Sequence, residues 1–283
     1  MKVGVIGAGS MGIGVAQCFA QYNYDVVLVD LQQEALEKAK GEIYNNMRFA
    51  SFYNKELAVQ DPESILKRIK FTTGYESLKD ADFIVENVPE QLEIKSTVYA
   101  QLEEVCPENC IYMVNTSCIS ITKVGALTRR AKKVIGVHFM NPVPLKPIVE
   151  AIRGYHTSEE TISTTKSILN SLEKEVILVE DYPGFVSNRI SHLFMNEAAY
   201  VLQDQVANPE EVDEIFVKGF GHKMGPLRTA DLIGLDVVVD SLNVLYESYQ
   251  DPKFRVCPLL RKMVDAGLLG RKSGKGFFEY AVM

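Results

Sequence analysis

The first 180 residues alternate between short apolar runs and segments in which apolar residues recur at helical spacing. An apolar strand pattern at 2–6 returns at 25–30, and between them Met11, Val15 and Cys18 lie three to four residues apart. Apolar residues at that spacing line one face of a helix. Strand, helix and strand within about 30 residues predict a parallel βαβ unit.

This alternation continues along the chain. Helical patterns cover 32–58, 91–105 and 158–172, with a short one starting at 121. Further strands are predicted at 81–86, 110–115, 133–138, 147–152 and 175–179. Strands that alternate with helices are typical of a doubly wound α/β sheet.

The pattern changes after Pro183 and Gly184, two residues that interrupt regular structure. Helical periodicity then replaces strand runs, with helices predicted at 185–204, 209–218, 228–249 and 256–266. We therefore predict an α/β domain over 1–182 and an all-helical domain over 183–283. Apolar positions of the second domain fit either an internal core or a dimer face, as at Leu232, Val239 and Leu242.

The 283 residues carry a formal net charge of −7, with 47% hydrophobic and 24% charged residues. This balance is typical of an ordinary globular chain. The negative charge argues against nucleic acid or an anionic membrane as a partner. No run reaches the roughly 18 apolar residues that a membrane span needs, and the first residues do not predict a signal peptide.

Five cysteines, an odd number without a CxxC pair, predict free thiols in a reducing cytoplasm rather than a disulfide framework. Cys106 and Cys110 lie close in sequence but have no histidine nearby. We therefore expect no metal site.

A glycine motif follows the first predicted strand. Gly7, Gly9 and Gly12 form the pattern GxGxxG, which opens a helix and is followed by Asp30 at the end of the next strand. Gly7 permits a tight turn, Gly9 lets the backbone approach a pyrophosphate, and Gly12 lets helix and strand pack closely. The amides at the helix start attract phosphates. Asp30 accepts hydrogen bonds from ribose hydroxyls and repels a 2′-phosphate, so the motif predicts a Rossmann-type site for NAD; a structural glycine turn is the alternative.

Four polar residues occupy the ends of predicted elements. His138 ends one strand and Glu150 lies in the next, so the two side chains could meet across neighbouring strands. Ser117 follows the strand that ends at Asn115. Asn188 is placed one turn into the first helix of the second domain. A carboxylate orients a histidine that acts as a general base. Neutral donors such as Ser117 and Asn188 can hold a substrate oxygen. With NAD, this set predicts hydride transfer from an alcohol.

Each of the four residues also has a structural explanation. A histidine at a strand end is often a satisfied structural group, and a glutamate in a strand often forms a salt bridge. Ser117 could cap a turn, although Ser120 is better placed to cap the helix at 121. Asn188 could be an exposed helix residue. The glycine motif is what joins the four residues into one site.

Several segments together resemble the short-chain 3-hydroxyacyl-CoA dehydrogenase family, most closely its bacterial 3-hydroxybutyryl-CoA type. The resemblance covers essentially the whole chain, and its most specific blocks lie at 136–150 and 183–189. The segments that carry it are Met-Gly-Ile-Gly at 11–14, Asn-Thr-Ser at 115–117, Gly-Val-His-Phe-Met-Asn-Pro at 136–142, Val-Glu at 149–150, Pro-Gly-Phe-Val-Ser-Asn-Arg at 183–189, Met-Gly-Pro-Leu at 224–227, Asp-Leu-Ile-Gly-Leu-Asp at 231–236 and Gly-Arg-Lys-Ser-Gly-Lys-Gly-Phe at 270–277.

The resemblance implies a Rossmann domain joined to a helical dimerisation domain, with an acyl thioester bound in the cleft between them and a homodimer as the assembly. It makes His138 the base, Glu150 its partner, and Ser117 and Asn188 the ligands of the substrate oxygen. It further assigns Asn141 to the substrate, and Met11, Glu90, Lys95 and Asn115 to the cofactor side; a surface salt bridge between Glu90 and Lys95 is an alternative. The segment 270–277 resembles a structural tail of the family.

Some positions depart from the family pattern. Relatives that use coenzyme A tend to carry lysines after the second strand, whereas 49–55 contains one lysine, Lys55. Lys146, Lys223 and Arg228 add basic groups at other family positions, and Cys118 replaces a common serine. This pattern resembles relatives that oxidise polar acyl groups, of the glyceryl or hydroxymalonyl type, on acyl carrier protein; neutral drift is the alternative.

Two other functions stay open. The scaffold resembles gulonate dehydrogenases, which act on a free sugar acid, and Arg228 or Lys146 could bind the carboxylate of such a substrate. It also resembles lens crystallins, which are non-catalytic, but the presence of all four candidate catalytic residues favours an enzyme.

Overall fold

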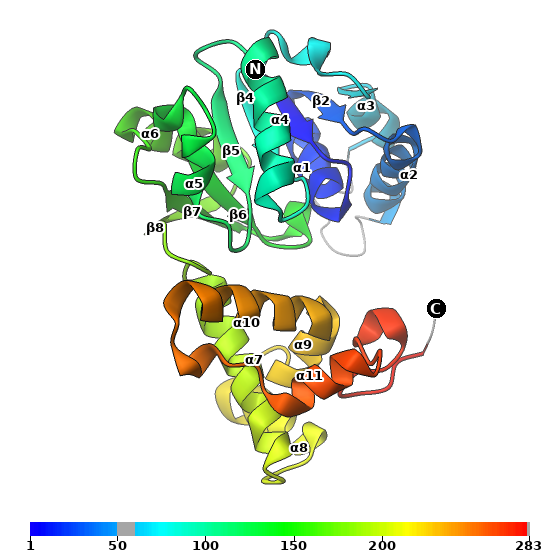
Figure 1. Ribbon diagram of the computed structural model, residues 1–283. Helices are drawn as coiled ribbons and strands as arrows, with labels where there is room; N and C mark the ends of the chain where they lie inside the picture. The colour runs from blue at the N-terminus through cyan, green and yellow to red at the C-terminus, as the bar shows by residue number, and fades with distance from the viewer. Residues whose placement is uncertain (50–59, 282–283) are drawn as a thin grey trace. The chain divides into compact units, whose positions relative to one another are not determined.

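The computed structural model describes residues 1–49 and 60–281. The chain divides into two compact units, residues 1–182 and 183–283 (Figure 1). Each unit has a hydrophobic core of its own.

Among the described residues of the first unit, eight strands form one sheet in the order β3-β2-β1-β4-β5-β6-β7-β8 (Figure 1). Neighbouring strands are parallel from β3 to β6, β7 is antiparallel to β6, and β8 is parallel to β7. The predicted α/β class and doubly wound sheet are confirmed. The strands are Lys2–Ile6 (β1), Asp25–Val29 (β2), Ile69–Thr72 (β3), Phe83–Glu86 (β4), Ile111–Asn115 (β5), Val134–Phe139 (β6), Ile148–Arg153 (β7) and Glu175–Glu180 (β8).

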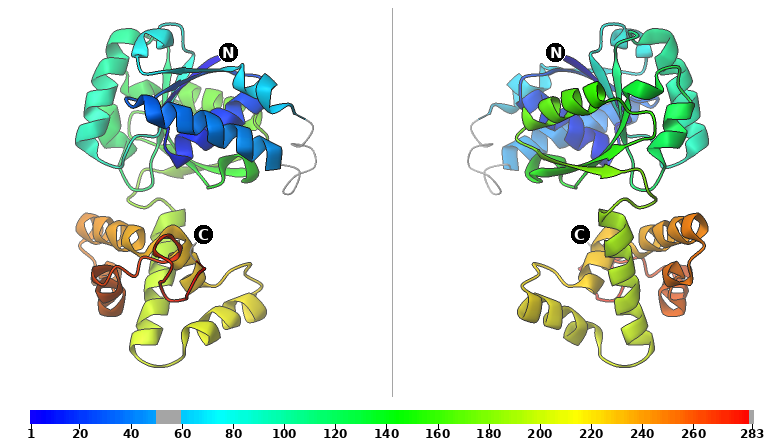
Figure 2. Two further views of the ribbon diagram at one scale, coloured as in Figure 1. Left: turned by 90° about the vertical axis from the view of Figure 1, so that its right-hand side faces the viewer. Right: turned by 90° about the vertical axis from the view of Figure 1, so that its left-hand side faces the viewer.

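Helices cover both faces of this sheet. Figure 2 shows α2 and α4 on opposite sides of it, and Phe19 of α1, Ile43 of α2 and Leu169 of α6 join one buried core. A parallel sheet needs apolar cover on both faces, which explains why its strands are almost continuously apolar. The helices are Ser10–Gln21 (α1), Gln33–Phe49 (α2), Pro62–Leu66 (α3), Leu92–Val105 (α4), Ile121–Ala126 (α5) and Glu159–Asn170 (α6), with 3₁₀ turns at Tyr75–Leu78, Ala131–Lys133 and Val143–Leu145.

Sequence patterns missed one strand and extended one helix. β3 is an edge strand of four residues in which only Ile69 is buried, so it lacks the apolar run that marks the other strands. The helix predicted at 32–58 is α2 as far as Phe49, and its remainder lies outside the described residues. The lysine-poor segment 49–55 falls outside them as well, apart from its first residue.

The second unit is helical. Its helices are Ser187–Gln203 (α7), Pro209–Glu214 (α8), Pro226–Ile233 (α9), Leu235–Tyr249 (α10) and Pro258–Asp265 (α11), with a π-helical turn at Ile215–Gly219 and 3₁₀ turns at Pro252–Phe254 and Arg271–Ser273. Met195 and Ala199 of α7 pack with Val238 and Leu242 of α10 in its main core.

Two details of this unit differ from the sequence-based expectation, and a third decides between alternatives that the sequence left open. The helix predicted at 228–249 is two helices, because Gly234 adopts a φ of 106° and ends α9. Asn188 is the second residue of α7 rather than one turn inside it. Val239 and Leu242 belong to the internal core, whereas Leu232 is 51% exposed.

Asp231 of α9 forms hydrogen bonds with the C-terminal segment. Its buried carboxylate accepts hydrogen bonds from the amides of Phe277 and Phe278, both at 3.0 Å, and from the hydroxyl of Tyr280 at 2.9 Å. The tail at 270–277, which the sequence suggests is structural, therefore forms part of the folded second unit.

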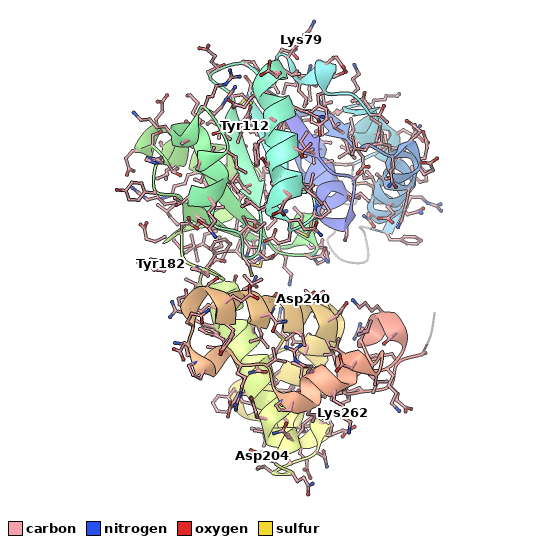
Figure 3. The ribbon with its side chains drawn as sticks, in the orientation of Figure 1. Lys79, Tyr112, Tyr182, Asp204, Asp240 and Lys262 are labelled. Carbon is pink, nitrogen blue, oxygen red and sulfur yellow. The ribbon has the colours of Figure 1, made fainter. Side chains whose placement is uncertain are left out.

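We expect Asp231→Asn to lower the free energy of unfolding by about 1–2 kcal/mol, because the neutral amide has one acceptor oxygen for three donors. Asp240→Asn is the control, since Asp240 is exposed on α10 (Figure 3). Denaturant titration followed by tyrosine fluorescence measures both. Equal stability of the two variants would contradict the prediction that the hydrogen bonds of Asp231 stabilise the folded chain.

No helix among the described residues is both long and apolar enough to cross a membrane. The described residues also contain no group of three or more His, Cys, Asp or Glu side chains that could hold a metal ion.

Candidate active site

His138 and Glu150 face each other across β6 and β7. The two strands are antiparallel, and their register places His138 directly opposite Glu150. Directly opposed residues point to the same face of a sheet, and Nδ1 of His138 lies 3.2 Å from Oε2 of Glu150. Both side chains are largely buried, with 11% and 8% of their surfaces exposed. Because a carboxylate only accepts, Nδ1 carries the hydrogen and the lone pair of the neutral ring lies on Nε2.

Ser117 lies on the other side of the same imidazole. It follows β5, and its Oγ is 3.3 Å from Nε2 of His138. The hydroxyl can donate to Nε2. Ser117, His138 and Glu150 therefore form a continuous hydrogen-bonded row in the first unit, in which Nε2 is the proton-accepting atom.

Glu90 holds the loop that carries Ser117. Its Oε1 accepts hydrogen bonds from the amides of Ser117, Cys118 and Ile119 at 3.0, 2.8 and 3.1 Å, and from the hydroxyl of Thr116 at 2.5 Å. Three consecutive amides that point to one oxygen form an anion-binding nest. The carboxylate thereby fixes the backbone of Ser117 relative to β5.

We expect Glu90→Ala to lower kcat/KM for the acyl thioester that the sequence resemblance implies about tenfold, since a hydrogen bond to a charged group contributes about 1.5 kcal/mol or more. Glu90→Gln is the matched variant, because its amide oxygen can still accept hydrogen bonds from the three amides. Its kcat/KM should fall less than that of Glu90→Ala. The NAD dissociation constant, measured for both variants, separates this effect from cofactor binding. An unchanged kcat/KM in Glu90→Ala would show that the loop holds its shape without the carboxylate.

Lys95 is paired with Glu86, not with Glu90. Its Nζ lies 2.8 Å from both carboxylate oxygens of Glu86, and neither side chain is exposed. A surface salt bridge between Glu90 and Lys95 is therefore wrong. Burial raises the pKa of Glu86, an effect that the charge of Lys95 opposes.

The glycine turn leaves open space beside its backbone. Gly7 has a φ of 93°, and a Cβ on Gly12 would lie 1.8 Å from the carbonyl oxygen of Gly7, so both positions require glycine. A Cβ on Gly9 would meet nothing within 4 Å. Gly9 is the N-cap of α1, so this open space lies at the start of a helix. The uncovered backbone at a helix start fits the pyrophosphate of a dinucleotide.

Asp30 connects this turn to β2. Its Oδ2 accepts from the amide of Ala8 at 2.7 Å, and its Oδ1 accepts from the amide of Gln32 at 3.0 Å. The carboxylate is thus held beside the glycine turn, where the ribose of a bound dinucleotide would lie.

Both parts of the chain match one protein family. Residues 2–182 match the family described as 3-hydroxyacyl-CoA dehydrogenase, NAD binding domain, and residues 184–280 match 3-hydroxyacyl-CoA dehydrogenase, C-terminal domain. The chain belongs to the 3-hydroxyacyl-CoA dehydrogenase family. The resemblance inferred from the sequence is confirmed.

Members of the 3-hydroxyacyl-CoA dehydrogenase family with similar sequences cover almost the whole chain. A 3-hydroxybutyryl-CoA dehydrogenase of Clostridioides difficile is 44% identical over 99% of both chains. Another, of Bradyrhizobium diazoefficiens, is 41% identical over 99% of this chain and 95% of its own. The crystal structure of (S)-3-hydroxybutyryl-CoA dehydrogenase from Ralstonia eutropha superimposes with a TM-score of 0.91, at 40% identity over 99% of both chains.

Within this 3-hydroxyacyl-CoA dehydrogenase, the other candidate residues have different surroundings. Asn115 donates to Asn87 at 2.7 Å and accepts from the amide of Phe139 at 3.3 Å, so it connects the ends of three neighbouring strands. Met11 is partly buried against the core of the first unit, and Asn141 is exposed just after β6. Asn188 lies in the second unit, in the first turn of α7.

The sequence did not indicate that Glu86 is the partner of Lys95, or that Glu90 holds the loop of Ser117. An acidic residue at the end of the buried strand Phe83–Glu86 is the signal for the first. Glu90 has no comparable signal, because its partners are backbone amides that lie 27 to 29 residues away in sequence.

Proposed function

We propose that this protein is an NAD-dependent dehydrogenase that interconverts a short 3-hydroxyacyl-CoA thioester, such as 3-hydroxybutyryl-CoA, and its 3-oxo form. The observation that carries this proposal is the hydrogen-bonded row Ser117–His138–Glu150. The strands next to this row belong to the same sheet as β1, the strand that the glycine turn follows. Gly7 follows β1 and His138 lies near the end of β6. In open α/β sheets the carboxyl ends of parallel strands form the ligand site.

His138 acts as the general base in this proposal. Its Nε2 accepts the proton of the substrate hydroxyl, and the carboxylate of Glu150 stabilises the imidazolium that results. Ser117 and Asn188 hold the substrate oxygen with neutral donors, and Asn141 contributes to the acyl site. Bound NAD would supply the hydride acceptor. The cofactor would be held by Gly7, Gly9, Met11, Gly12, Asp30, Glu90 and Asn115, with Lys95 acting through Glu86.

Asp30 is the reason that we propose NAD rather than NADP as the cofactor. A carboxylate that is already held by two backbone amides can accept from ribose hydroxyls but repels a 2′-phosphate.

Coenzyme A is the proposed carrier, because the relatives compared above are named for coenzyme A thioesters. The test is kcat/KM for 3-hydroxybutyryl groups on coenzyme A, for 3-hydroxybutyryl and glyceryl groups on acyl carrier protein, and for free hydroxy acids, each with NAD. We expect coenzyme A to be preferred by at least tenfold. A preference for acyl carrier protein or for a free acid would overturn the assignment.

We also propose a cytoplasmic homodimer. The second unit exposes apolar side chains on neighbouring helices, namely Leu232, Ile233, Val237 and Val244. Val237 and Val244 lie seven residues apart and so share one face of α10, and apolar side chains exposed on one face are typical of a subunit interface. Five buried, unbridged cysteines suit a reducing compartment. Light scattering should give twice the chain mass of 31.7 kDa; a monomer mass at micromolar concentration would exclude the dimer.

A further inference from the structure

Lys174 is a charged residue inside the first unit. It lies between α6 and β8, and only 4% of its surface is exposed. Its Nζ donates to two backbone carbonyls, those of Val143 and Lys146, both at 2.8 Å. Lys95, the other buried lysine among the described residues, is held by the carboxylate of Glu86 instead. A buried lysine usually pairs with a carboxylate, whereas Lys174 binds the main chain of one turn.

The neighbouring backbone places Lys174 beside this turn. After α6, Glu173 adopts a left-handed conformation with a φ of 56°, and the amide of Lys174 donates to the carbonyl of Leu169 at 3.1 Å. The next residue, Glu175, begins β8, and its amide donates to the carbonyl of Pro147 at 2.6 Å. Lys174 therefore lies next to the start of β7, and its side chain reaches the turn that precedes β7.

The turn that Lys174 binds connects the two strands of the candidate site. It covers residues 142–146, between β6, which carries His138, and β7, which carries Glu150. Within the turn, the carbonyl of Pro142 accepts from the amides of Leu145 and Lys146 at 3.0 and 3.2 Å. The backbone of the 142–146 turn is thus hydrogen-bonded both to itself and to Lys174.

Packing holds the 142–146 turn at one end only. Val143 is buried against α1, where a Cβ on Gly14 would lie 3.1 Å from the Cβ of Val143. At the other end, the side chains of Leu145 and Lys146 are exposed. A buried carbonyl without a donor is unfavourable, and one ammonium group offers several donors. The hydrogen bonds from Lys174 therefore fix the part of the turn that packing does not.

We propose that Lys174 is a positioning residue for the acyl substrate. By holding the 142–146 turn, it fixes Asn141, which directly precedes the turn and has an exposed side chain. This inference rests on the proposed function, in which Asn141 contributes to the acyl site. The pairing of His138 with Glu150 is set by the register of β6 and β7. Lys174 should therefore affect substrate binding more than the chemical step.

The test is steady-state kinetics of Lys174→Met, which keeps an unbranched side chain of nearly the same length but has no donor. We expect KM for 3-hydroxybutyryl-CoA to rise about tenfold, with kcat within about threefold and the NAD dissociation constant within about twofold of their original values. Losing contacts that bind substrate and transition state alike raises KM without lowering kcat. A lysine that only stabilised the fold would lower the melting temperature and leave KM unchanged, and that result would overturn the proposal.

Three further variants sharpen this test. Lys79→Met is the control, because Lys79 is exposed (labelled in Figure 3), and its KM should stay at the original value. Lys174→Gln retains an amide donor, so its KM should lie between those of the unmodified chain and Lys174→Met; it takes the same measurements if Lys174→Met does not fold. In an Asn141→Ala background, Lys174→Met should raise KM no further, since its effect passes through Asn141. Equal rises in both backgrounds would overturn this assignment.

Hydrogen exchange tests the 142–146 turn without any turnover. A peptide that covers 140–149 should exchange faster in Lys174→Met than in Lys79→Met, because the amides of Leu145 and Lys146 lose protection when the turn loosens. Unchanged exchange and unchanged KM in an active protein would contradict the role of Lys174 alone. An unmodified chain that does not oxidise 3-hydroxybutyryl-CoA would instead contradict the proposed function, and with it the role of Lys174 in substrate binding.

Discussion

Replacing His138 with glutamine is expected to lower kcat for 3-hydroxybutyryl-CoA oxidation by roughly 10²–10⁴, the contribution that general-base catalysis typically makes. Glutamine can still contact Ser117 and Glu150 through its amide, but it has no lone pair that accepts a proton near neutral pH. The NAD dissociation constant should stay near its original value, because the glycine turn and Asp30 do not involve His138. Steady-state absorbance of reduced cofactor and calorimetric titration of NAD measure the two quantities.

His156→Gln is the matched control for this variant. His156 is an exposed histidine of the same unit, and its ring contacts Tyr155 rather than the candidate site. Its removal should leave kcat unchanged. Turnover of His138→Gln within a few-fold of that of His156→Gln would remove His138 from the proposed mechanism.

Gly9→Ala is expected to weaken NAD binding by roughly 10- to 100-fold while the protein stays folded. Gly9 has a φ of −74° and a ψ of −178°, which alanine adopts readily, and its added methyl group would meet no protein atom within 4 Å. If the pyrophosphate occupies the space over Gly9, the methyl group overpacks it at a cost of about 1–3 kcal/mol. Titration with NAD and a thermal melt of the free protein measure affinity and stability separately.

Gly41→Ala provides the comparison, because a Cβ on Gly41 in α2 also meets nothing within 4 Å. It should leave NAD affinity unchanged and stabilise the helix slightly. Equal NAD affinity in the two variants would place the cofactor elsewhere. Gly12→Ala is a poorer test, since its Cβ would overlap the Gly7 carbonyl and disturb the fold itself.

Most strands of the first unit could be predicted from the sequence because buried parallel strands are short, Val-rich and bounded by polar residues. The pairing of His138 with Glu150 could be expected once both residues were assigned to neighbouring strands, because the register of two paired strands decides which residues lie opposite each other. β3 could not be predicted, because an edge strand of four residues has no continuous apolar run. The division between α9 and α10 depends on the left-handed backbone of Gly234, and a glycine within a helical pattern does not by itself reveal that conformation.

The candidate site was predictable where it depends on residue type and not where it depends on backbone geometry. The glycine turn, Asp30 and His138 have chemical signatures in the sequence. The nest around Glu90 consists of loop amides, which every residue except proline carries, so only the folded chain brings them to one oxygen. Lys95 illustrates the same limit, because its buried partner is Glu86 and not the acidic residue closer to it in sequence.

We propose that this protein transfers the hydrogen on C3 of a 3-hydroxyacyl-CoA thioester directly to NAD. The most direct measurement is mass spectrometry of the reduced cofactor after a single turnover with 3-hydroxybutyryl-CoA that carries deuterium at C3. The deuterium should appear in the reduced cofactor, and His138→Gln should form this labelled product far more slowly. Reduced cofactor without deuterium, or no reduction at all, would contradict it.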